Sequence, residues 1–311
     1  MPQVVKNGIN MYQGNSAALE VLSWVGFVTA LFGNTLLLSY FLSKGEKGAS
    51  TVQAIGASSN VIMLSQIYMA GFMPTAAFGV MAVVTAAAVA VNLSKVTGLL
   101  DKAEAGGSLW GSWQDLLGLI GVAMLPQALW LTFTTSASLL PGYLCGGLGI
   151  LFLLLEKLRK LPPQLQGAWA SVPAWTATLL FMFQPVAQLV RNFAVPSSLQ
   201  GLSVGTILLA MVGNGLMVPR ALATKDAIWF TGSAWGSLMG WAQLLSMFLG
   251  HSLTGGRYLS EPAFALATVV YFGFNAAVLQ ANSSSKGLSS PLASLGTLAS
   301  NPDAEALMEE S

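Results

Sequence analysis

Carboxamide side chains interrupt the long apolar stretches of this sequence, and five of them are candidates for a binding site: Asn34, Gln66, Gln127, Asn214 and Gln243. A carboxamide both donates and accepts hydrogen bonds, so a group of them suits a ligand rich in hydroxyl groups, such as a sugar. The alternative is hydrogen bonding between neighbouring helices, which contributes well under ~2 kcal/mol for each bond in a membrane. The sequence leaves both alternatives open.

Aromatic and proline residues add two further features of a binding path. Trp130 and Trp235 lie within apolar runs and are candidates to stack on the apolar face of a sugar ring. A proline removes a backbone hydrogen bond from a helix and permits a kink. Pro2, Pro126 and Pro185 are therefore candidate hinges, although a fixed bend is the commoner outcome.

The composition of the chain indicates that its solvent is a lipid bilayer. Of its 311 residues, 54% are hydrophobic and only 8% are charged. Soluble domains contain about 25% charged residues, so this chain has too few to cover its surface in water. The net charge of +1 excludes the strongly basic surface of a nucleic-acid-binding protein.

Successive apolar runs predict an all-α polytopic membrane protein with nine to ten transmembrane helices. A helix needs about 20 mostly apolar residues to span a bilayer. Residues 1–14 resemble the tail of a further, first helix, which we expect to begin upstream of Met1. The nine other runs are Val21–Leu42, Val52–Phe72, Ala76–Leu99, Leu116–Phe133, Pro141–Leu155, Trp169–Phe193, Ser203–Ala221, Ala227–Leu249 and Pro262–Leu279.

Basic residues are distributed unevenly among the connections between these runs. With residues 1–14 counted as helix 1, only Lys6, Arg191 and Arg257 follow odd-numbered helices. An excess of Lys and Arg marks the side of the membrane that corresponds to the cytoplasm. Both termini are therefore predicted to face that side. The basic residues that follow even-numbered helices are Lys44, Lys47, Lys95, Lys102, Lys157, Arg159, Lys160, Arg220, Lys225 and Lys286.

A repeat links the start of the chain with its second half. "PQVVKN" at residues 2–7 resembles "AQLVRN" at residues 187–192, "ALFGNTLLLSYFLS" resembles "AMVGNGLMVPRALA", and Gln66 corresponds roughly to Gln243. Each unit is three helices long, and both cross the membrane in the same direction, as in transporters with parallel repeats. The predicted parts are the first repeat (1–75), linker helices (76–160), the second repeat (161–250), a last helix (251–280) and a disordered tail (281–311).

Several kinds of chemistry are missing from the sequence. No Walker A pattern is present, so the chain itself is not expected to hydrolyse ATP. No cluster of metal ligands occurs, and neither a metal nor another cofactor is expected. No acidic residue lies deep within an apolar run, whereas proton-coupled carriers usually keep an ionisable group there. These observations favour a passive carrier over a proton symporter and over an intramembrane enzyme.

The repeated segments, together with "GNSAAL", "LPQALW" and "WFTGSAWGSLMGW", resemble the maltose-excess family of plastid envelope maltose transporters. The resemblance covers roughly residues 1–250. More distantly, both repeats resemble PQ-loop membrane proteins, which include the SWEET sugar carriers. The resemblance implies facilitated diffusion of maltose, a product of starch degradation, across the chloroplast inner envelope membrane. By analogy with the SWEET carriers, it also implies that Asn34 and Asn214 contact the sugar.

Two other functions stay open at this point. A PQ-loop-type carrier of another small solute, such as glucose or an amino acid, would be expected to show proton-dependent flux. A non-transporting membrane receptor would bind its ligand without flux. Self-association is also left open. The sequence shows no transit peptide, which would be rich in Arg and Ser, so a chloroplast location rests on the resemblance.

Overall fold

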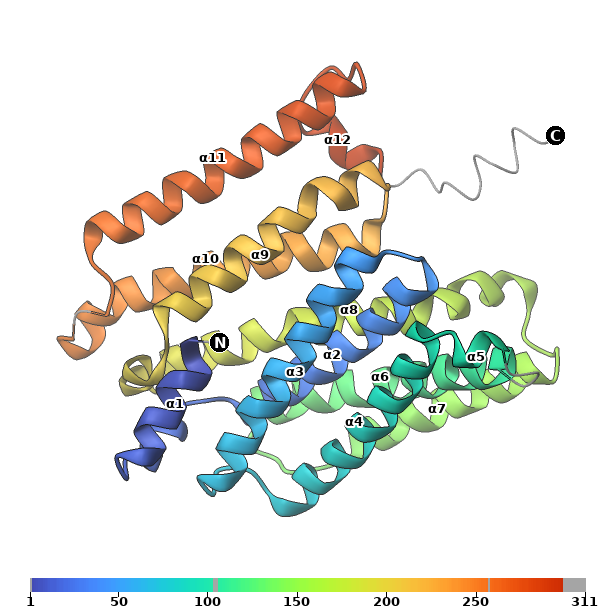
Figure 1. Cartoon of the computed structure of the whole chain (residues 1–311), viewed down its shortest axis with the longest axis horizontal. Coiled ribbons are helices and arrows are strands. Elements are labelled where there is room, and N and C mark those ends of the chain that lie inside the picture. The colour runs from blue at the N-terminus through green and yellow to red at the C-terminus, as the bar shows by residue number, and fades with distance from the viewer. Residues whose placement is uncertain (1, 103–105, 257, 299–311) are drawn as a thin grey trace. The chain divides into compact units, whose positions relative to one another are not determined.

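The computed structural model describes residues 2–102, 106–256 and 258–298, and these residues form helices and connections without any strand (Figure 1). The predicted all-α fold is confirmed, and each of the nine apolar runs overlaps one long helix. The long helices are α2 (Trp24–Ser43), α3 (Lys47–Met69), α4 (Thr75–Val96), α6 (Gly106–Phe133), α7 (Leu140–Lys157), α8 (Pro163–Ala194), α9 (Val204–Ala223), α10 (Ala227–Thr254) and α11 (Glu261–Ser285). The short elements are α1 (Pro2–Tyr12), α5 (Leu99–Lys102), α12 (Ala293–Gly296) and the 3₁₀ helices η1 (Ser16–Leu19) and η2 (Pro196–Gly201).

Six helices within the described ranges are long and apolar enough to cross a membrane, namely α2, α4, α6, α7, α9 and α11. Six is fewer than the nine to ten spans predicted from the sequence. The helices α3, α8 and α10 coincide with predicted runs but are not among the six. In α3 the apolar character is diluted by Gln53, Ser58, Ser59 and Asn60.

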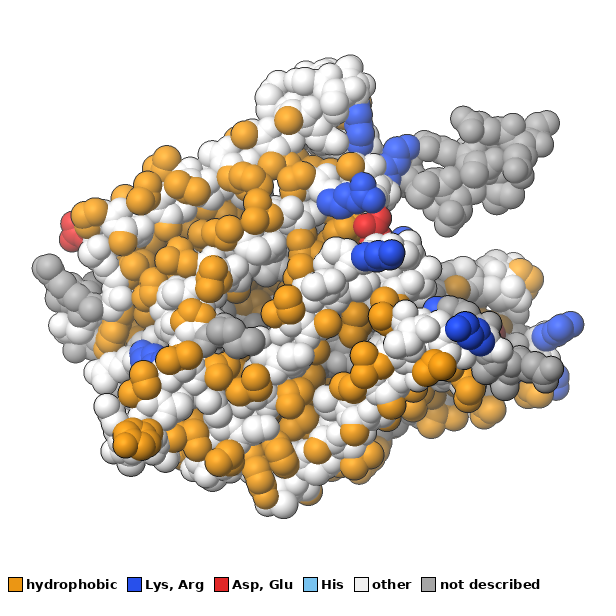
Figure 2. All heavy atoms as spheres, in the orientation of Figure 1, with side chains coloured by type: hydrophobic (Ala, Val, Ile, Leu, Met, Phe, Trp, Pro, Cys, Tyr) orange, Lys and Arg blue, Asp and Glu red, His pale blue; other side chains and the backbone are white. Residues whose placement is uncertain are grey.

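The outer faces of several helices carry exposed apolar side chains. Val83 on α4 and Val269 on α11 are each 71% exposed. Figure 2 shows hydrophobic side chains spread over the visible faces of both halves of the chain. Such surfaces are unfavourable in water but suit contact with lipid.

The chain divides into two compact units, the first covering Gln3–Arg191 and the second beginning at Asn192. The first unit contains α1 from Gln3 onward, α2 to α7 and nearly all of α8, whereas Pro2 is grouped with the second unit. The boundary falls near the end of α8 and so differs from the predicted repeat boundaries, which stay a prediction.

In the first unit, α2 is the central helix. Ser23 begins α2 by accepting a hydrogen bond from the backbone N–H of Gly26, and the left-handed residue Gly45 ends the turn that follows. A β-carbon on Gly33 would lie 2.5 Å from the backbone nitrogen of Phe181, so α2 and α8 approach each other backbone to backbone. The Ser39 hydroxyl donates to Asn92 of α4 (3.0 Å) and accepts from the indole of Trp113 of α6 (3.1 Å).

In the second unit, α9 and α10 form a tight hairpin. The Asp226 carboxylate accepts a hydrogen bond from the backbone N–H of Trp229 at 2.9 Å and so caps α10. A β-carbon on Gly240 would lie 2.8 Å from the β-carbon of Met211, so the two helices pack closely. Trp241 joins α10 to α11, because its indole N–H donates to Thr268 at 3.0 Å and its ring packs on aromatic residues of α11.

Local features recur in the two units at residue numbers that differ by 180. Ser23 caps α2 and Ser203 caps α9 by the same side-chain contact. The turn after each helix is also the same, since the N–H of Glu46 bonds to Phe41 and the N–H of Asp226 bonds to Ala221, both at 3.0 Å. Further buried pairs with this separation are Leu19 and Leu199, Leu22 and Leu202, Leu31 and Met211, Phe41 and Ala221, Leu64 and Leu244, and Ile67 and Met247.

Two sequence predictions concern segments that look different in the structure. Part of the tail predicted to be disordered is helical, because α11 continues to Ser285 and α12 follows it. The hydroxyl of Ser283 donates to the carbonyl of Ser290 at 2.8 Å and fastens this segment, whereas residues 299–311 lie outside the described residues. Pro126 and Pro185 lie inside unbroken helices and Pro2 begins α1, so their role as hinges stays a prediction.

Candidate functional site

Gln66 belongs to a polar network that fastens α1 to α3. The Gln3 amide donates to Asn7 (2.9 Å), the Asn7 amide donates to Gln66 (3.1 Å), and the Gln66 amide donates to the carbonyl of Val4 (3.0 Å). Gln3 and Asn7 are 5% and 1% exposed. These carboxamides therefore satisfy one another inside the protein.

A similar contact joins the end of α8 to α10. The Asn192 amide donates to the Ser246 hydroxyl (3.0 Å), which donates in turn to the carbonyl of Gln243 (2.7 Å). Asn192 corresponds to Asn7 in the sequence repeat, so by this contact the counterpart of Gln66 is Ser246. Gln243, which the sequence comparison paired with Gln66, lies one helical turn earlier and is buried.

Asn34 and Asn214 make the same two contacts in their two units. Each side-chain amide donates to the backbone carbonyl four residues earlier, that of Ala30 at 2.7 Å and that of Ala210 at 2.8 Å. Each side chain also faces a glycine on the next helix of its hairpin. A β-carbon on Gly56 would lie 2.5 Å from Asn34 Oδ1, and one on Gly236 would lie 2.8 Å from Asn214 Cγ.

This geometry favours a packing role for the two asparagines in the conformation described. Asn34 is only 5% exposed, and its amide is engaged with its own helix. Asn214 is half-buried and is engaged in the same way. Sugar contact by either residue stays a prediction that requires a second conformation in which the hairpin opens.

The remaining predicted residues lie on α6 and α10, where Trp235 directly precedes the Gly236 that faces Asn214. Gln127 connects α6 to α7, because its amide donates to Ser138 (3.0 Å) and its oxygen accepts from the N–H of Gly142 (3.2 Å). Trp130 is 37% exposed on α6, and Trp235 is half-buried on α10.

Separations along the helices place Gln66 and Gln243 at other levels than the asparagines of their units. Gly56, against which Asn34 packs, precedes Gln66 by ten positions on α3, which is about 15 Å along the helix axis. In the second unit, Gly236 precedes Gln243 by seven positions on α10, or about 10 Å. The structure thus distributes the predicted residues along the helices.

Several buried polar atoms lack a hydrogen-bond partner among the described residues, and we consider two that the sequence did not single out. They are Oε1 of Gln53 on α3 and Oγ1 of Thr178 on α8, whose residues are 4% and 0% exposed. A buried polar group without a partner costs free energy and calls for a ligand, a water or a change of conformation. Threonine is common in helices and usually bonds to its own backbone, so the sequence carries no signal for Thr178.

An elongated groove of about 600 Å³ lies in the first unit between α2, α4, α6 and the start of α7. Gln127 is the only predicted site residue of this unit that lines it. Its walls are almost entirely apolar, which is a poor match for a sugar.

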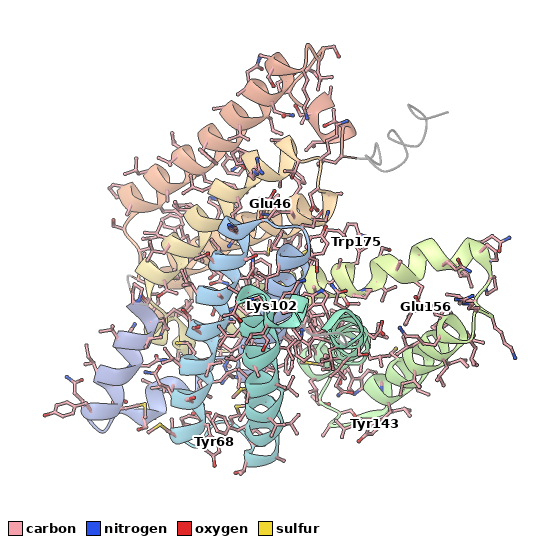
Figure 3. All side chains as sticks on the ribbon, turned by 45° about the vertical axis from the view of Figure 1, so that its right-hand side comes forward. Glu46, Tyr68, Lys102, Tyr143, Glu156 and Trp175 are labelled. Atoms are coloured by element: carbon pink, nitrogen blue, oxygen red, sulfur yellow. The ribbon has the colours of Figure 1, made fainter. Side chains whose placement is uncertain are left out.

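The far end of α7, away from the groove, carries an ion pair and a charged hydrogen bond. Lys157 forms an ion pair with Asp115 of α6 at 2.7 Å, and Glu156 accepts a hydrogen bond from the indole of Trp169 at 2.8 Å. Figure 3 shows Glu156 at the opposite end of α7 from Tyr143. Among the described residues, no group of three or more His, Cys, Asp or Glu is placed to hold a metal ion.

The class of this protein is all-helical within the described residues, with six helices that are long and apolar enough to cross a membrane. Residues 1–101 match the family described as the maltose excess protein 1 N-terminal domain. The chain belongs to the maltose excess protein 1 family, as its sequence motifs suggest.

Two relatives support this assignment over nearly the whole chain. A protein of Oryza sativa subsp. japonica named "Maltose excess protein 1-like, chloroplastic" is 40% identical over 301 residues, which are 96% of this chain and 73% of the relative. A protein of Arabidopsis thaliana named "Maltose excess protein 1, chloroplastic" is 36% identical over 305 residues, which are 97% of this chain and 71% of the relative. No solved structure shows a significant match to the chain.

Proposed function

We propose that this protein carries maltose across the chloroplast inner envelope membrane by facilitated diffusion. The observation that carries the proposal is the similarity, over 96–97% of the chain, to two chloroplastic proteins named for maltose. Six apolar helices of spanning length make a membrane carrier physically reasonable.

The proposal includes membrane crossings by α3, α8 and α10 in addition to the six apolar helices. Support comes from the hairpins. α3 begins four residues after α2 ends and packs along it, with Gly56 at the level of Asn34. If α2 lies in the bilayer, α3 lies at the same depth, and the same reasoning applies to α10 beside α9. The polar side chains of α3 are tolerated there because they face neighbouring helices.

The proposal also includes two three-helix repeats of the PQ-loop type. It is supported by the local features that recur 180 residues apart, from the capping serines to the glycines that face Asn34 and Asn214. The contacts of Asn7 with Gln66 and of Asn192 with Ser246 extend the correspondence to the first helix of each repeat. Repeats of this kind suit a carrier in which two similar halves alternate around one substrate.

Passive rather than proton-coupled transport is supported by the positions of two acidic residues. Asp226 caps the start of α10, and Asp115 is paired with Lys157. Both carboxylates therefore have structural partners, one at a helix start and one between two helices, whereas proton-coupled carriers usually keep an ionisable group within the membrane.

Uptake into proteoliposomes tests the proposed function. Labelled maltose is expected to enter vesicles that contain the protein, and its rate of uptake is expected to saturate with maltose concentration. The rate is expected not to depend on an imposed pH gradient. Uptake of labelled glucose is measured in parallel. Empty vesicles and vesicles with heat-denatured protein are the controls. Absence of saturable maltose flux with folded protein would contradict the proposal, and flux driven by protons would favour a coupled carrier of another solute.

The asparagine sites are tested in the same assay. Asn34→Ala and Asn214→Ala are expected to abolish maltose uptake in protein that still folds, as judged by its elution as a single species. Unchanged flux in both variants would leave these residues with packing roles only.

A further inference from the structure

The groove of the first unit has the shape of an elongated channel along the helix axes. Lining residues on α2 and α4 recur every four positions along one face of each helix, and those on α6 extend from Ile120 to Leu131. At 1.5 Å per residue, the groove follows α2 and α4 for about 12 Å and α6 for about 16 Å. The residues of the two matching stripes are Trp24, Val28 and Phe32 on α2, and Ala76, Val80 and Val84 on α4.

Two polar side chains of the groove, those of Thr29 and Gln127, are already engaged with the protein. The Thr29 hydroxyl donates to the carbonyl of Gly26 at 2.8 Å, and the Gln127 carboxamide bonds to Ser138 and Gly142. None of the described residues that line the groove is charged. A sugar would lose its hydration there without gaining hydrogen bonds in return, whereas an apolar chain would lose nothing.

The two ends of the groove differ in chemistry. One end lies where α2 and α7 begin, with Trp24 as the first residue of α2 and Tyr143 72% exposed near the start of α7 (Figure 3). Trp and Tyr combine an apolar ring with a polar tip and favour the boundary between hydrocarbon and head groups. The basic residues Lys95 and Lys157 lie at the opposite ends of α4 and α7.

We propose that this groove binds one acyl chain of a bilayer lipid whose head group carries no net charge. The chain occupies the apolar channel, and the head group lies at the end marked by Trp24 and Tyr143, where the lining offers no charge to pair with an anionic head group. Small residues of α4, Ala76 and Ala77, leave the space that the chain fills. The inference rests on the proposed function only in placing these helices in a bilayer, and it is independent of which solute is transported.

Photolabelling of the full chain in liposomes tests the proposal. Phosphatidylcholine with a photoreactive group in its acyl chain is the neutral probe, and phosphatidylglycerol with the same chain is the anionic one. The neutral lipid is expected to label peptides from α4 and α6 on the groove more than the anionic lipid does. Saturating maltose is expected to leave this labelling unchanged.

Variants that fill the groove provide the matched comparison. Ala76→Phe and Ala77→Phe are expected to lower labelling of the groove peptides about tenfold, a change typical of steric exclusion from an apolar pocket. Ala87→Phe is the control, because Ala87 is exposed on α4 and does not line the groove. Ala76 is itself exposed, so its replacement is compatible with folding even where that of the half-buried Ala77 is not.

Three results would overturn the proposal: equal labelling of all three variants, stronger labelling by the anionic lipid, or protection by maltose. The last would assign the groove to the sugar path. Maltose uptake measured on the same vesicles separates this outcome from failure of the proposed function, since labelling requires a folded protein in lipid but no flux.

Discussion

The side chain of Asn34 on α2 occupies the space in which Gly56 of α3 would carry a β-carbon, 2.5 Å from Asn34 Oδ1. The asparagine thus packs against bare backbone, and its amide turns back to Ala30. A small residue opposite a polar one lets two membrane helices approach closely. Asn214 and Gly236 pack in the same way in the other unit, so both hairpins are held by an asparagine that faces a glycine.

A methyl group at position 56 is therefore expected to destabilise the protein. Gly56→Ala forces Asn34 or the α3 backbone to shift, an overpacking cost of about 1–3 kcal/mol. The double variant Gly56→Ala with Asn34→Ala removes the clash and is expected to recover part of this loss. Denaturant unfolding in detergent, read as a double-mutant cycle, measures the coupling.

Gly79→Ala is the control for this cycle. Gly79 lies on α4, and a β-carbon there would meet nothing within 4 Å. Because alanine is the better helix former by up to about 1 kcal/mol, this variant is expected to be neutral or more stable. A cycle in which the Gly56 and Asn34 substitutions were simply additive would show that the two side chains do not meet.

The polar network of α1 gives a second prediction. Gln66→Leu removes the acceptor of Asn7 and the donor to the Val4 carbonyl. Each buried group left without a partner costs about 1–3 kcal/mol, so α1 is expected to detach from α3. Limited proteolysis measures this detachment: cleavage within α1 is expected to become faster, whereas the cleavage sites in the rest of the chain stay the same.

Ser65→Ala on the same helix is the comparison. The Ser65 hydroxyl donates only to the carbonyl of Val61 in its own helix, at 2.8 Å, so its loss is expected to leave α1 in place. Equal proteolysis of the two variants would show that Gln66 does not hold α1.

Much of the helical architecture follows from the sequence because apolar runs are long and their connections are short. Helix ends were less predictable. α8 begins at Pro163, six residues before the apolar run, and α11 continues to Ser285 beyond Leu279. Polar turns extend a helix past its apolar part without any hydropathy signal, because their stability comes from local hydrogen bonds such as that of Ser283.

The candidate residues were predictable as positions but their partners were not. Asn34 and Asn214 stood out because a polar residue within an apolar run needs a partner. Which partner each one finds depends on helix rotation, and this is set by close approaches at glycines such as Gly33 and Gly56. Since these approaches arise only from tertiary packing, the sequence could not choose between a sugar contact and a packing role.

The buried hydroxyl of Thr178 gives a third prediction. Thr178→Val keeps the shape of the side chain and removes an oxygen that has no partner among the described residues. Relief of this desolvation is expected to stabilise the protein by about 1 kcal/mol. Apparent melting temperature in detergent measures the gain, and maltose uptake measured alongside shows whether the hydroxyl serves the solute path.

Thr176→Val is the matched control, two residues earlier on the same helix. The Thr176 hydroxyl donates to the carbonyl of Val172 at 2.8 Å, so its removal forfeits a hydrogen bond and is expected to give no gain in stability. A melting temperature for Thr178→Val below that of the unmodified protein would mean that the hydroxyl has a favourable partner after all.

The uneven distribution of basic residues predicts that the two ends of α7 lie on opposite sides of the membrane. Lys157 is the last residue of the helix and Arg159 and Lys160 follow it, whereas residues 134–139 before the helix carry no charge. In a Cys145→Ser background, a cysteine at Thr135 and one at Lys160 are therefore expected on opposite sides of the membrane. A membrane-impermeant maleimide added to sealed vesicles, before and after permeabilisation, measures the side of each. Labelling of both positions from the same side would mean that α7 does not cross the bilayer, and the proposed order of crossings would then be wrong from α7 onward.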